Sequence, residues 1–310
     1  MKFLTYFYGD VKSYGCLLDV CNILDIPSLK NTSLPNNLNK FLIDFNENIL
    51  NLSKVIKLNK FNAVNVNEVK IDALIEPNSF RDFYAFRKHV EAGRKSRGLD
   101  MIEEYDEFPV FYFSNHNSVV GPGDICLFRE QFSKLDFELE VAVIISKIGE
   151  NIKAKDAYKY VAGFTILNDW SSRQVQMKEM KLNLGPAKGK DFASSIGPYL
   201  VTLDEISDKS VGKIEDLRID LDMKAYLNDK LVSNDNFKNI TWSFPEMIER
   251  ASYGAKLFPG DLIGSGTCAT GCLLEINQTN KTNIWLKNGD NIKLSIERLG
   301  TLENTIKSID

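Results

Sequence analysis

Short runs of β-branched and aromatic residues, separated by glycine and proline, fill the chain from about residue 75 onward and constrain its fold more than any other feature. Examples are "FPVFYFS", "ELEVAVIIS", "YVAGFTILND" and "NIKLSIERLGTLEN". Runs of this length and composition predict strands. Helical patterns are limited to residues 154–160, 171–180 and 243–252, without the regular strand–helix alternation of a Rossmann fold or a TIM barrel. The pattern predicts a mainly β or α+β fold.

Residues 1–74 have a different texture. Two strand-like runs, "KFLTYFY" and "SYGCLLDV", flank a Gly-Asp turn signal, and the stretch "NKFLIDFNENILNLSKVI" at 39–56 has helical periodicity. We therefore expect a small N-terminal α+β domain over 1–74 and a larger β-rich domain over 75–310.

The composition is that of an ordinary globular protein. The 310 residues are 44% hydrophobic and 26% charged, with a formal net charge of -4. This balance gives no electrostatic reason to expect nucleic acid or an anionic membrane as a partner. The N-terminus lacks the cleavage pattern of a signal peptide, and no apolar segment reaches membrane-spanning length. We expect a cytoplasmic protein.

The cysteines and histidines limit the available chemistry. Five scattered cysteines without a C-x-x-C pair argue against a disulfide framework and against a structural zinc site. Cys268 and Cys272 flank a loop rich in glycine and threonine, and a chemical role for them is disfavoured. Any mechanism that needs an imidazole must use His89 or His116, because the chain has only 2 histidines.

The stretch "KLDFELEVAVI" at 134–144 would, as a strand, place Asp136, Glu138 and Glu140 on one face and apolar side chains on the other. Neighbouring carboxylates on that face lie about 6.7 Å apart and repel one another. The face is therefore solvated, or something positive sits on it.

Two further acids lie next to aromatic residues. Asp82 precedes "FYAF", and His89 lies seven residues later, on the same side if this stretch is helical. Asp169 ends an apolar strand before Trp170. Four such acids converging would make a site for Mg²⁺ or Mn²⁺. Taken singly, each acid also fits an ordinary role on a solvated strand face or as a cap, and these alternatives stay open.

The order and wording of these segments resemble the fumarylacetoacetate hydrolase superfamily across residues 75–310. The matching pieces are "DFYAFRKH" at 82–89, "FPVFYFSNHNSVVGPGD" at 108–124, "LDFELEVAVII" at 135–145, "NDWSSRQVQ" at 168–176, "GPAKGKDFASSIGPYLV" at 185–201 and "PGDLIGSGTCATGCLLE" at 259–275. The resemblance implies a catalytic domain with a mixed β-sandwich or β-roll, a homodimer, and a member of bacterial or archaeal type.

The resemblance also implies a metal site. In the family four acids hold one divalent cation, here Mg²⁺ or else Mn²⁺ or Ca²⁺. The matching positions are Asp82, Glu138, Glu140 and Asp169. Asp136 lies outside that pattern, so we interpret it as an acid behind the ligands or on the surface.

Family substrates are 2-oxo or 2,4-dioxo carboxylic acids. The resemblance implies that His89, oriented by Glu275, activates water, and that Gln176 and Lys190 stabilise the developing oxyanion. It implies substrate contacts from Tyr84 and Thr267, and recognition of the substrate anion by Arg97 or by Arg94. Met180 stands where fumarylacetoacetases carry a substrate-contacting tyrosine.

Three functions remain open. The leading one is metal-dependent hydrolysis of a C–C bond in a fumarylacetoacetate-like or acylpyruvate-like acid. The second is isomerisation, decarboxylation, hydration or dehydration of a 2-oxo acid at the same site. The third is a catalytically silent binding protein, which the intact ligand set disfavours.

Overall fold

The computed structural model describes residues 1–58, 63–95 and 98–309. In this part of the chain the larger of two main sheets has 12 strands. Its principal order is β4 (Ala63–Asn65), β3 (Asn22–Asp25), β2 (Val11–Leu17), β1 (Lys2–Tyr8), β14 (Ser194–Val201), β12 (Val161–Asp169), β11 (Leu139–Ile145), β19 (Leu262–Gly264), β6 (Phe80–Phe83) and β7 (Phe111–Phe113). The short strands β5 (Lys70–Ile71) and β8 (Val119–Val120) pair with β1 and β14.

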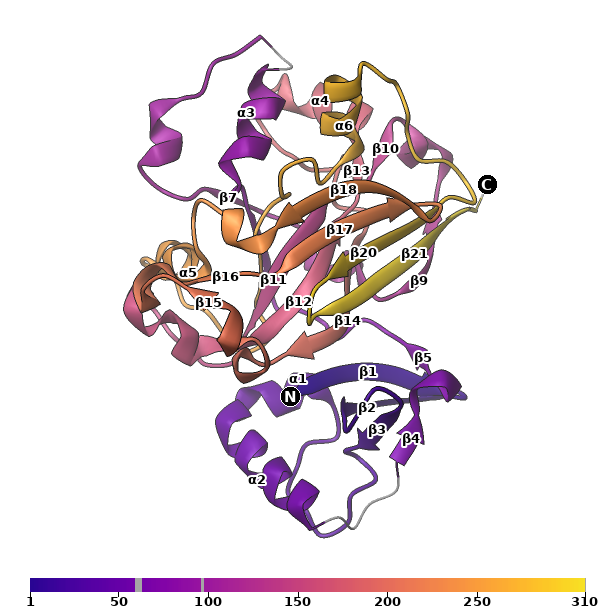
Figure 1. The fold of residues 1–310 in the computed structure, drawn as a ribbon, viewed down its shortest axis with the longest axis vertical. Helices are drawn as coiled ribbons and strands as arrows, with labels where there is room; N and C mark the ends of the chain where they lie inside the picture. The colour runs from indigo at the N-terminus through magenta and orange to yellow at the C-terminus, as the bar shows by residue number, and fades with distance from the viewer. Residues whose placement is uncertain (59–62, 96–97, 310) are drawn as a thin grey trace.

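The second main sheet has 5 strands within the described residues and lies against the larger one (Figure 1). Its order is β18 (Lys230–Asn236), β17 (Asp222–Leu227), β20 (Asn291–Ile296), β21 (Gly300–Ser308) and β9 (Gly123–Leu127). Two small ladders join β10 (Leu135–Asp136) to β13 (Ser171–Ser172), and β15 (Ser210–Val211) to β16 (Arg218–Ile219). The expected β-dominated α+β fold is confirmed.

Strand β11 is buried on both faces, which explains why its sequence is almost continuously apolar. Val141, Val143 and Ile145 belong to the core that the two sheets share. Ala142 and Ile144 point the other way, into a core that also contains the N-terminal helices. The two-residue period of a strand therefore makes β11 the layer between two cores.

The N-terminal segment extends the large sheet rather than standing apart from it. In β1, Phe3 pairs with Leu200 of β14, and Phe3 packs in the same core as Ile196 and Leu200. Helices α1 (Leu38–Ile43) and α2 (Phe45–Lys57) cover this end of the sheet (Figure 1). Whether residues 1–74 form a domain of their own stays a prediction.

The helices differ in part from the expectation. The stretch 39–56 forms two helices, α1 and α2, and residues 154–160 form a 3₁₀ rather than an α-helix. Helices α4 (Arg173–Met180) and α5 (Phe244–Ser252) lie in the expected segments. Two helices at the upper end of the molecule in Figure 1 were not predicted from the sequence, α3 (Arg87–Lys95) and α6 (Leu273–Asn280).

Strand register brings the ends of neighbouring strands together. Asp169 of β12 pairs with Ser194 of β14, and Gly264 of β19 pairs with Asp82 of β6. Between them lies β11, whose Ala142 pairs with Gly264. Acids distant in sequence are thus placed at one edge of the sheet.

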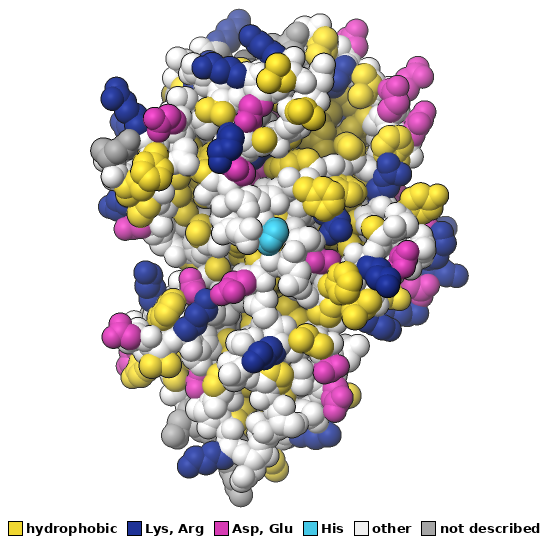
Figure 2. Space-filling model, turned by 180° about the vertical axis from the view of Figure 1, so that it is seen from behind, with side chains coloured by type: hydrophobic (Ala, Val, Ile, Leu, Met, Phe, Trp, Pro, Cys, Tyr) yellow, Lys and Arg dark blue, Asp and Glu magenta, His cyan; other side chains and the backbone are white. Residues whose placement is uncertain are grey.

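The described helices include none that is long and apolar enough to cross a membrane. Figure 2 shows basic and acidic side chains interspersed over one face of the molecule.

Candidate active site

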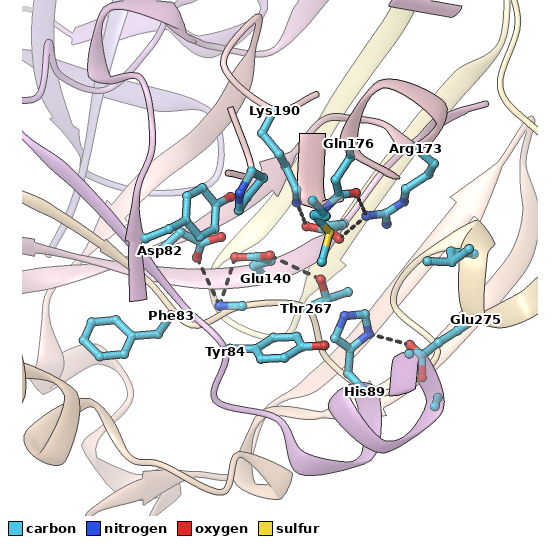
Figure 3. Close-up of a pocket in the computed structure, with 18 of the residues that line it drawn as sticks. Asp82, Phe83, Tyr84, His89, Glu140, Arg173, Gln176, Lys190, Thr267 and Glu275 are labelled. Atoms are coloured by element: carbon cyan, nitrogen blue, oxygen red, sulfur yellow. Dashed lines mark hydrogen bonds and ion pairs between the residues drawn. The ribbon is translucent and has the colours of Figure 1, made fainter. Parts of the chain in front are cut away.

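A cavity of about 990 Å³ opens at this edge of the sheet, between α3, α4 and α6 (Figure 3). Most residues singled out from the sequence line it: Asp82, Tyr84, His89, Glu138, Glu140, Gln176, Lys190, Thr267 and Glu275. Asp169 is buried and is not among the lining residues, but it contacts Lys190, which is one of them. Arg97 lies outside the described residues. Arg94 donates a hydrogen bond to the carbonyl of Asp100 and is not among the lining residues.

Asp82 and Glu140 meet at one backbone amide. The N–H of Gly266 donates to Asp82 Oδ1 at 3.2 Å and to Glu140 Oε2 at 3.1 Å. Two glycines permit this approach: a Cβ at Gly264 would lie 2.4 Å from Asp82 Oδ1, and Gly266 has a φ of +74°. The Thr267 hydroxyl lies 3.4 Å from Glu140 Oε1.

Glu138 and Asp169 both bond to one basic side chain, that of Lys190. The Lys190 ammonium bonds to Glu138 Oε2 and, at 2.7 Å, to Asp169 Oδ2. Arg173 contacts the other oxygen of Glu138 at 2.8 Å. Burial opposes ionisation of Glu138, but Lys190 and Arg173 hold its pKa at about 2. Glu138 is therefore ionised, whereas burial raises the pKa of Asp169 above its usual value although Lys190 opposes the shift.

The other pair, Asp82 and Glu140, makes no ion pair with a basic side chain among the described residues, and both carboxyls resist ionisation. Burial, with the nearby Asp169 carboxylate, raises the pKa of Asp82 to about 7. Burial, with Asp82 and Glu138, raises the pKa of Glu140 well above its usual range. Buried oxygen ligands with excess negative charge are what Mg²⁺ or Mn²⁺ prefers. The donor set fits a hard divalent cation beside Asp82 and Glu140.

A third cluster lies opposite these acids. His89 of α3 and Glu275 of α6 are buried, and His89 Nδ1 lies 2.9 Å from Glu275 Oε2 (Figure 3). A hydrogen bond from Nδ1–H to a carboxylate fixes the tautomer in which Nε2 can accept a proton. The ring of Tyr84 stands edge-on to His89, with centroids 5.7 Å apart.

The helical register between Asp82 and His89 was wrong. Asp82 lies in strand β6, and α3 begins only at Arg87. The two side chains reach one cavity because the chain turns between strand and helix. The prediction that they share a site rests on the resemblance, not on helical spacing.

Gln176 and Met180 both project from α4 into the cavity. The amide oxygen of Gln176 accepts a hydrogen bond of 3.2 Å from Arg173. Met180 is partly exposed, so at this position the wall offers a thioether where the family pattern has a phenol.

Asp136 is not a surface acid, because its exposed fraction is 0%. Its carboxylate accepts bonds from Arg173 Nε at 2.8 Å and from the amides of Leu273 and Leu274, at 2.7 and 3.0 Å. Those amides begin α6, so Asp136 caps the helix that carries Glu275. Asp136 and Glu138 hold the pKa of Arg173 well above its usual value although burial opposes the charge.

Replacement of Asp136 by asparagine is expected to lower the free energy of unfolding by about 3 kcal/mol, because Arg173 would stay buried with one charged partner fewer. Mn²⁺ affinity should change little, since Asp136 contacts Arg173 and backbone amides rather than the cavity. Urea unfolding and titration calorimetry measure the two quantities. A large loss of Mn²⁺ affinity would place Asp136 among the ligands.

Sequence reasoning assigned no role to Arg173, Tyr112 or Glu179. The Tyr112 hydroxyl donates to Asp169, and Ser194 Oγ lies 3.2 Å from the other Asp169 oxygen. Arg173 and Tyr112 lie inside the segments that carry the family resemblance, which was the available signal.

Glu179 shapes the loop that delivers Lys190. Its carboxylate accepts hydrogen bonds from three successive amides, those of Ala187 at 3.2 Å, Lys188 at 2.8 Å and Gly189 at 3.1 Å. The acceptor for these three amides is thus a side chain of α4, outside the loop itself. Glu179 is therefore a positioning residue for Lys190.

Replacement of Glu179 by alanine should lower the free energy of unfolding by about 2 kcal/mol, through the lost amide partners. Lys190 should also become less well placed. Lys178→Ala, one residue away on an exposed part of α4, is the matched control. Chemical denaturation of both variants measures the loss of stability, and kcat of the folded variants with saturating Mg²⁺ measures the placement of Lys190. Stabilities equal to the parent, or an unchanged kcat, would contradict the positioning role.

Comparison with known proteins shows the family to which the chain belongs. The model of the fumarylacetoacetate (FAA) hydrolase C-terminal family matches residues 78–307. The chain belongs to the fumarylacetoacetate hydrolase family. The match covers both main sheets from β6 onward and every acid of the cavity.

Relatives in this family carry different activities in their names. A fumarylacetoacetate hydrolase domain-containing protein 2 homolog of Dictyostelium discoideum is 29% identical over 99% of this chain and 97% of its own. The oxaloacetate tautomerase YisK of Bacillus subtilis is 31% identical over 78% of this chain and 74% of its own. The solved fumarylacetoacetate hydrolase of Exiguobacterium antarcticum has a TM-score of 0.74 at 22% identity and covers 99% of both chains, which shows a shared fold.

Proposed function

We propose that this family member is a divalent-metal-dependent enzyme that hydrolyses a C–C bond in a small dioxo carboxylic acid of the acylpyruvate or fumarylacetoacetate kind. The observation that carries the proposal is the buried hydrogen bond between His89 and Glu275 at the wall of a cavity whose opposite wall is acidic. This pair supplies a base, and the acids supply a place for the cation.

In the proposed reaction His89 Nε2 takes a proton from water in the cavity. Glu275 holds Nδ1–H and stabilises the imidazolium that results. The water oxygen then attacks the carbonyl carbon beside the bond that breaks. The proton on His89 returns to the departing carbon, so each turnover consumes one water and leaves the pair unchanged.

Asp82, Glu138, Glu140 and Asp169 would hold the cation. When bound, it supplies positive charge to the 2-oxo and carboxylate oxygens of the substrate. Lys190 already contacts two of these acids, so its ammonium lies where it can stabilise a developing oxyanion. Gln176, Tyr84 and Thr267 are proposed to orient the substrate from the surrounding walls.

A second candidate is tautomerisation of a 2-oxo dicarboxylic acid, favoured by the 31% identity to a protein named oxaloacetate tautomerase. The same base can move a proton between carbon and oxygen without consuming water. The two reactions thus differ in whether a C–C bond breaks.

A substrate screen tests the proposal. The chain is assayed with saturating Mg²⁺ on acylpyruvates, fumarylacetoacetate and the enol form of oxaloacetate, and the products are identified by mass spectrometry. Two carboxylic acids from one substrate support hydrolysis. Ketonisation of oxaloacetate without cleavage of any dioxo acid supports the second candidate. No Mg²⁺-dependent turnover at all would contradict both.

A cytoplasmic location and a homodimer remain predictions. Fractionation of cells and sedimentation of the purified chain would measure them.

A further inference from the structure

A second set of metal-binding side chains lies on the far side of the cavity from the acids. His89, Cys272 and Glu275 are all buried, and one donor atom from each lies within 4.8 Å of the other two. Among the described residues, no other group of three or more such donors meets this criterion. His89 and Glu275 line the cavity, so an ion can approach the group from there.

The Cys272 side chain is fully buried. Cys272 is the N-cap residue of α6, but its side chain makes no capping hydrogen bond. Asp136 instead accepts the amides of Leu273 and Leu274. Within the described part of the chain, Cys272 Sγ has no hydrogen-bond partner. Burial, with the charge of Asp136, raises the pKa of this thiol well above its usual value, so it is neutral at rest.

These donors differ in kind from the acidic set. Imidazole with a thiolate suits Zn²⁺ and Co²⁺, whereas carboxylates alone suit Mg²⁺. Three protein ligands also leave a fourth tetrahedral position open, as in many zinc enzymes. Donors of a tetrahedral zinc site lie about 3.5 Å apart, so spacings within 4.8 Å need only small side-chain rotations.

We propose that His89, Cys272 and Glu275 form a site for a thiophilic divalent cation such as Zn²⁺, distinct from the acidic site, and that its occupation switches the enzyme off. Binding replaces the thiol proton, which is released to solvent, and forms a metal–sulfur bond. The imidazole and carboxylate then coordinate the ion and can no longer hold a proton for catalysis. The inhibition, unlike the metal binding, rests on the proposed function of His89.

Co²⁺ is the probe, because a cobalt–thiolate bond absorbs in the near ultraviolet. All variants for this experiment are made in a parent protein in which Cys21→Ser and Cys126→Ser remove the two exposed thiols. With Mg²⁺ saturating, one equivalent of Co²⁺ should produce the thiolate band, and Zn²⁺ should abolish it. Cys272→Ser should lose the band, whereas Cys268→Ser, at another buried cysteine, should keep it.

Glu275→Gln is a second variant that retains the thiol. It should weaken Co²⁺ binding by at least about tenfold, the loss that even outer partners of a metal ligand can cause. Circular dichroism verifies folding, and Cys272→Ala replaces Cys272→Ser if the serine variant fails to fold. A parent without the band, or a band that survives loss of Cys272, would overturn the site.

A separate experiment measures the effect of Zn²⁺ on turnover. Zn²⁺ should inhibit turnover over the same concentrations at which it abolishes the cobalt band, and a chelator should reverse the inhibition. If Co²⁺ binds but Zn²⁺ does not inhibit turnover, the proposed inhibition is wrong and the proposed metal site stands. Because the absorption band needs no turnover, failure of the proposed function would not affect the binding result.

Discussion

His89→Ala is expected to lower kcat by about 10² to 10⁴ on the best substrate, the usual contribution of a general base. The structure gives the reason: the imidazole is buried at the cavity wall with Nδ1 committed to Glu275 at 2.9 Å. Mg²⁺ affinity should stay near that of the parent, because His89 is not among the four proposed Mg²⁺ ligands. Steady-state kinetics with saturating Mg²⁺ measure the change.

Glu275→Gln should lower kcat in the same direction, and the double variant should be little worse than His89→Ala alone, since the two residues act as one unit. His116→Ala is the matched control, because His116 is the other histidine and does not line the cavity. A near-parental kcat in His89→Ala would rule out hydrolysis by this pair. Additive losses would show that Glu275 has a separate role.

Glu138→Gln and Glu140→Gln should both abolish Mn²⁺ binding, because each removes an anionic oxygen from a small ligand set. Their effects on stability without metal should differ. Glu138 neutralises Lys190 and Arg173, so its loss should cost about 3 kcal/mol. Glu140 has a raised pKa and lies among other acids, so glutamine should cost little or even stabilise the metal-free protein.

Titration calorimetry with Mn²⁺ and urea unfolding in a chelator measure both properties. Asp136→Asn provides the reference with the opposite behaviour, lower stability with retained affinity. Unchanged Mn²⁺ affinity in both glutamate variants would refute the proposed ligand set. Equal stability of Glu138→Gln and Glu140→Gln would contradict the inference that Glu138 neutralises basic side chains whereas Glu140 lies among other acids.

Local sequence pattern predicted the strands well and the helices less well. The apolar runs of β11 and β12 are almost continuous because both strands are buried on both faces. Helix α6 was missed because it begins directly after a glycine-rich loop and has few apolar positions of helical period. Its N-terminus depends on Asp136, which lies 137 residues away from Leu273.

Residues of the site were likewise predicted only in part. The acids could be singled out because carboxylates beside apolar strands are unusual, and the resemblance then supplied the set. Local pattern did not single out Arg173 or Glu179, since an arginine or glutamate on a helix usually faces water. The pair of His89 and Glu275 spans 186 residues, and no local pattern reveals such a contact.

The pairing of β1 with β14 has a consequence for shortened versions of this chain. Without residues 1–74, β14 would lose its pairing with β1. Strand β8 would still pair with the first residues of β14, but the part around Leu200 would become an open sheet edge, next to an uncovered apolar surface that includes Ile196. Exposed edges of this kind recruit strands from other molecules. We therefore expect a fragment limited to the family match to self-associate and precipitate, even though it retains every residue of the cavity.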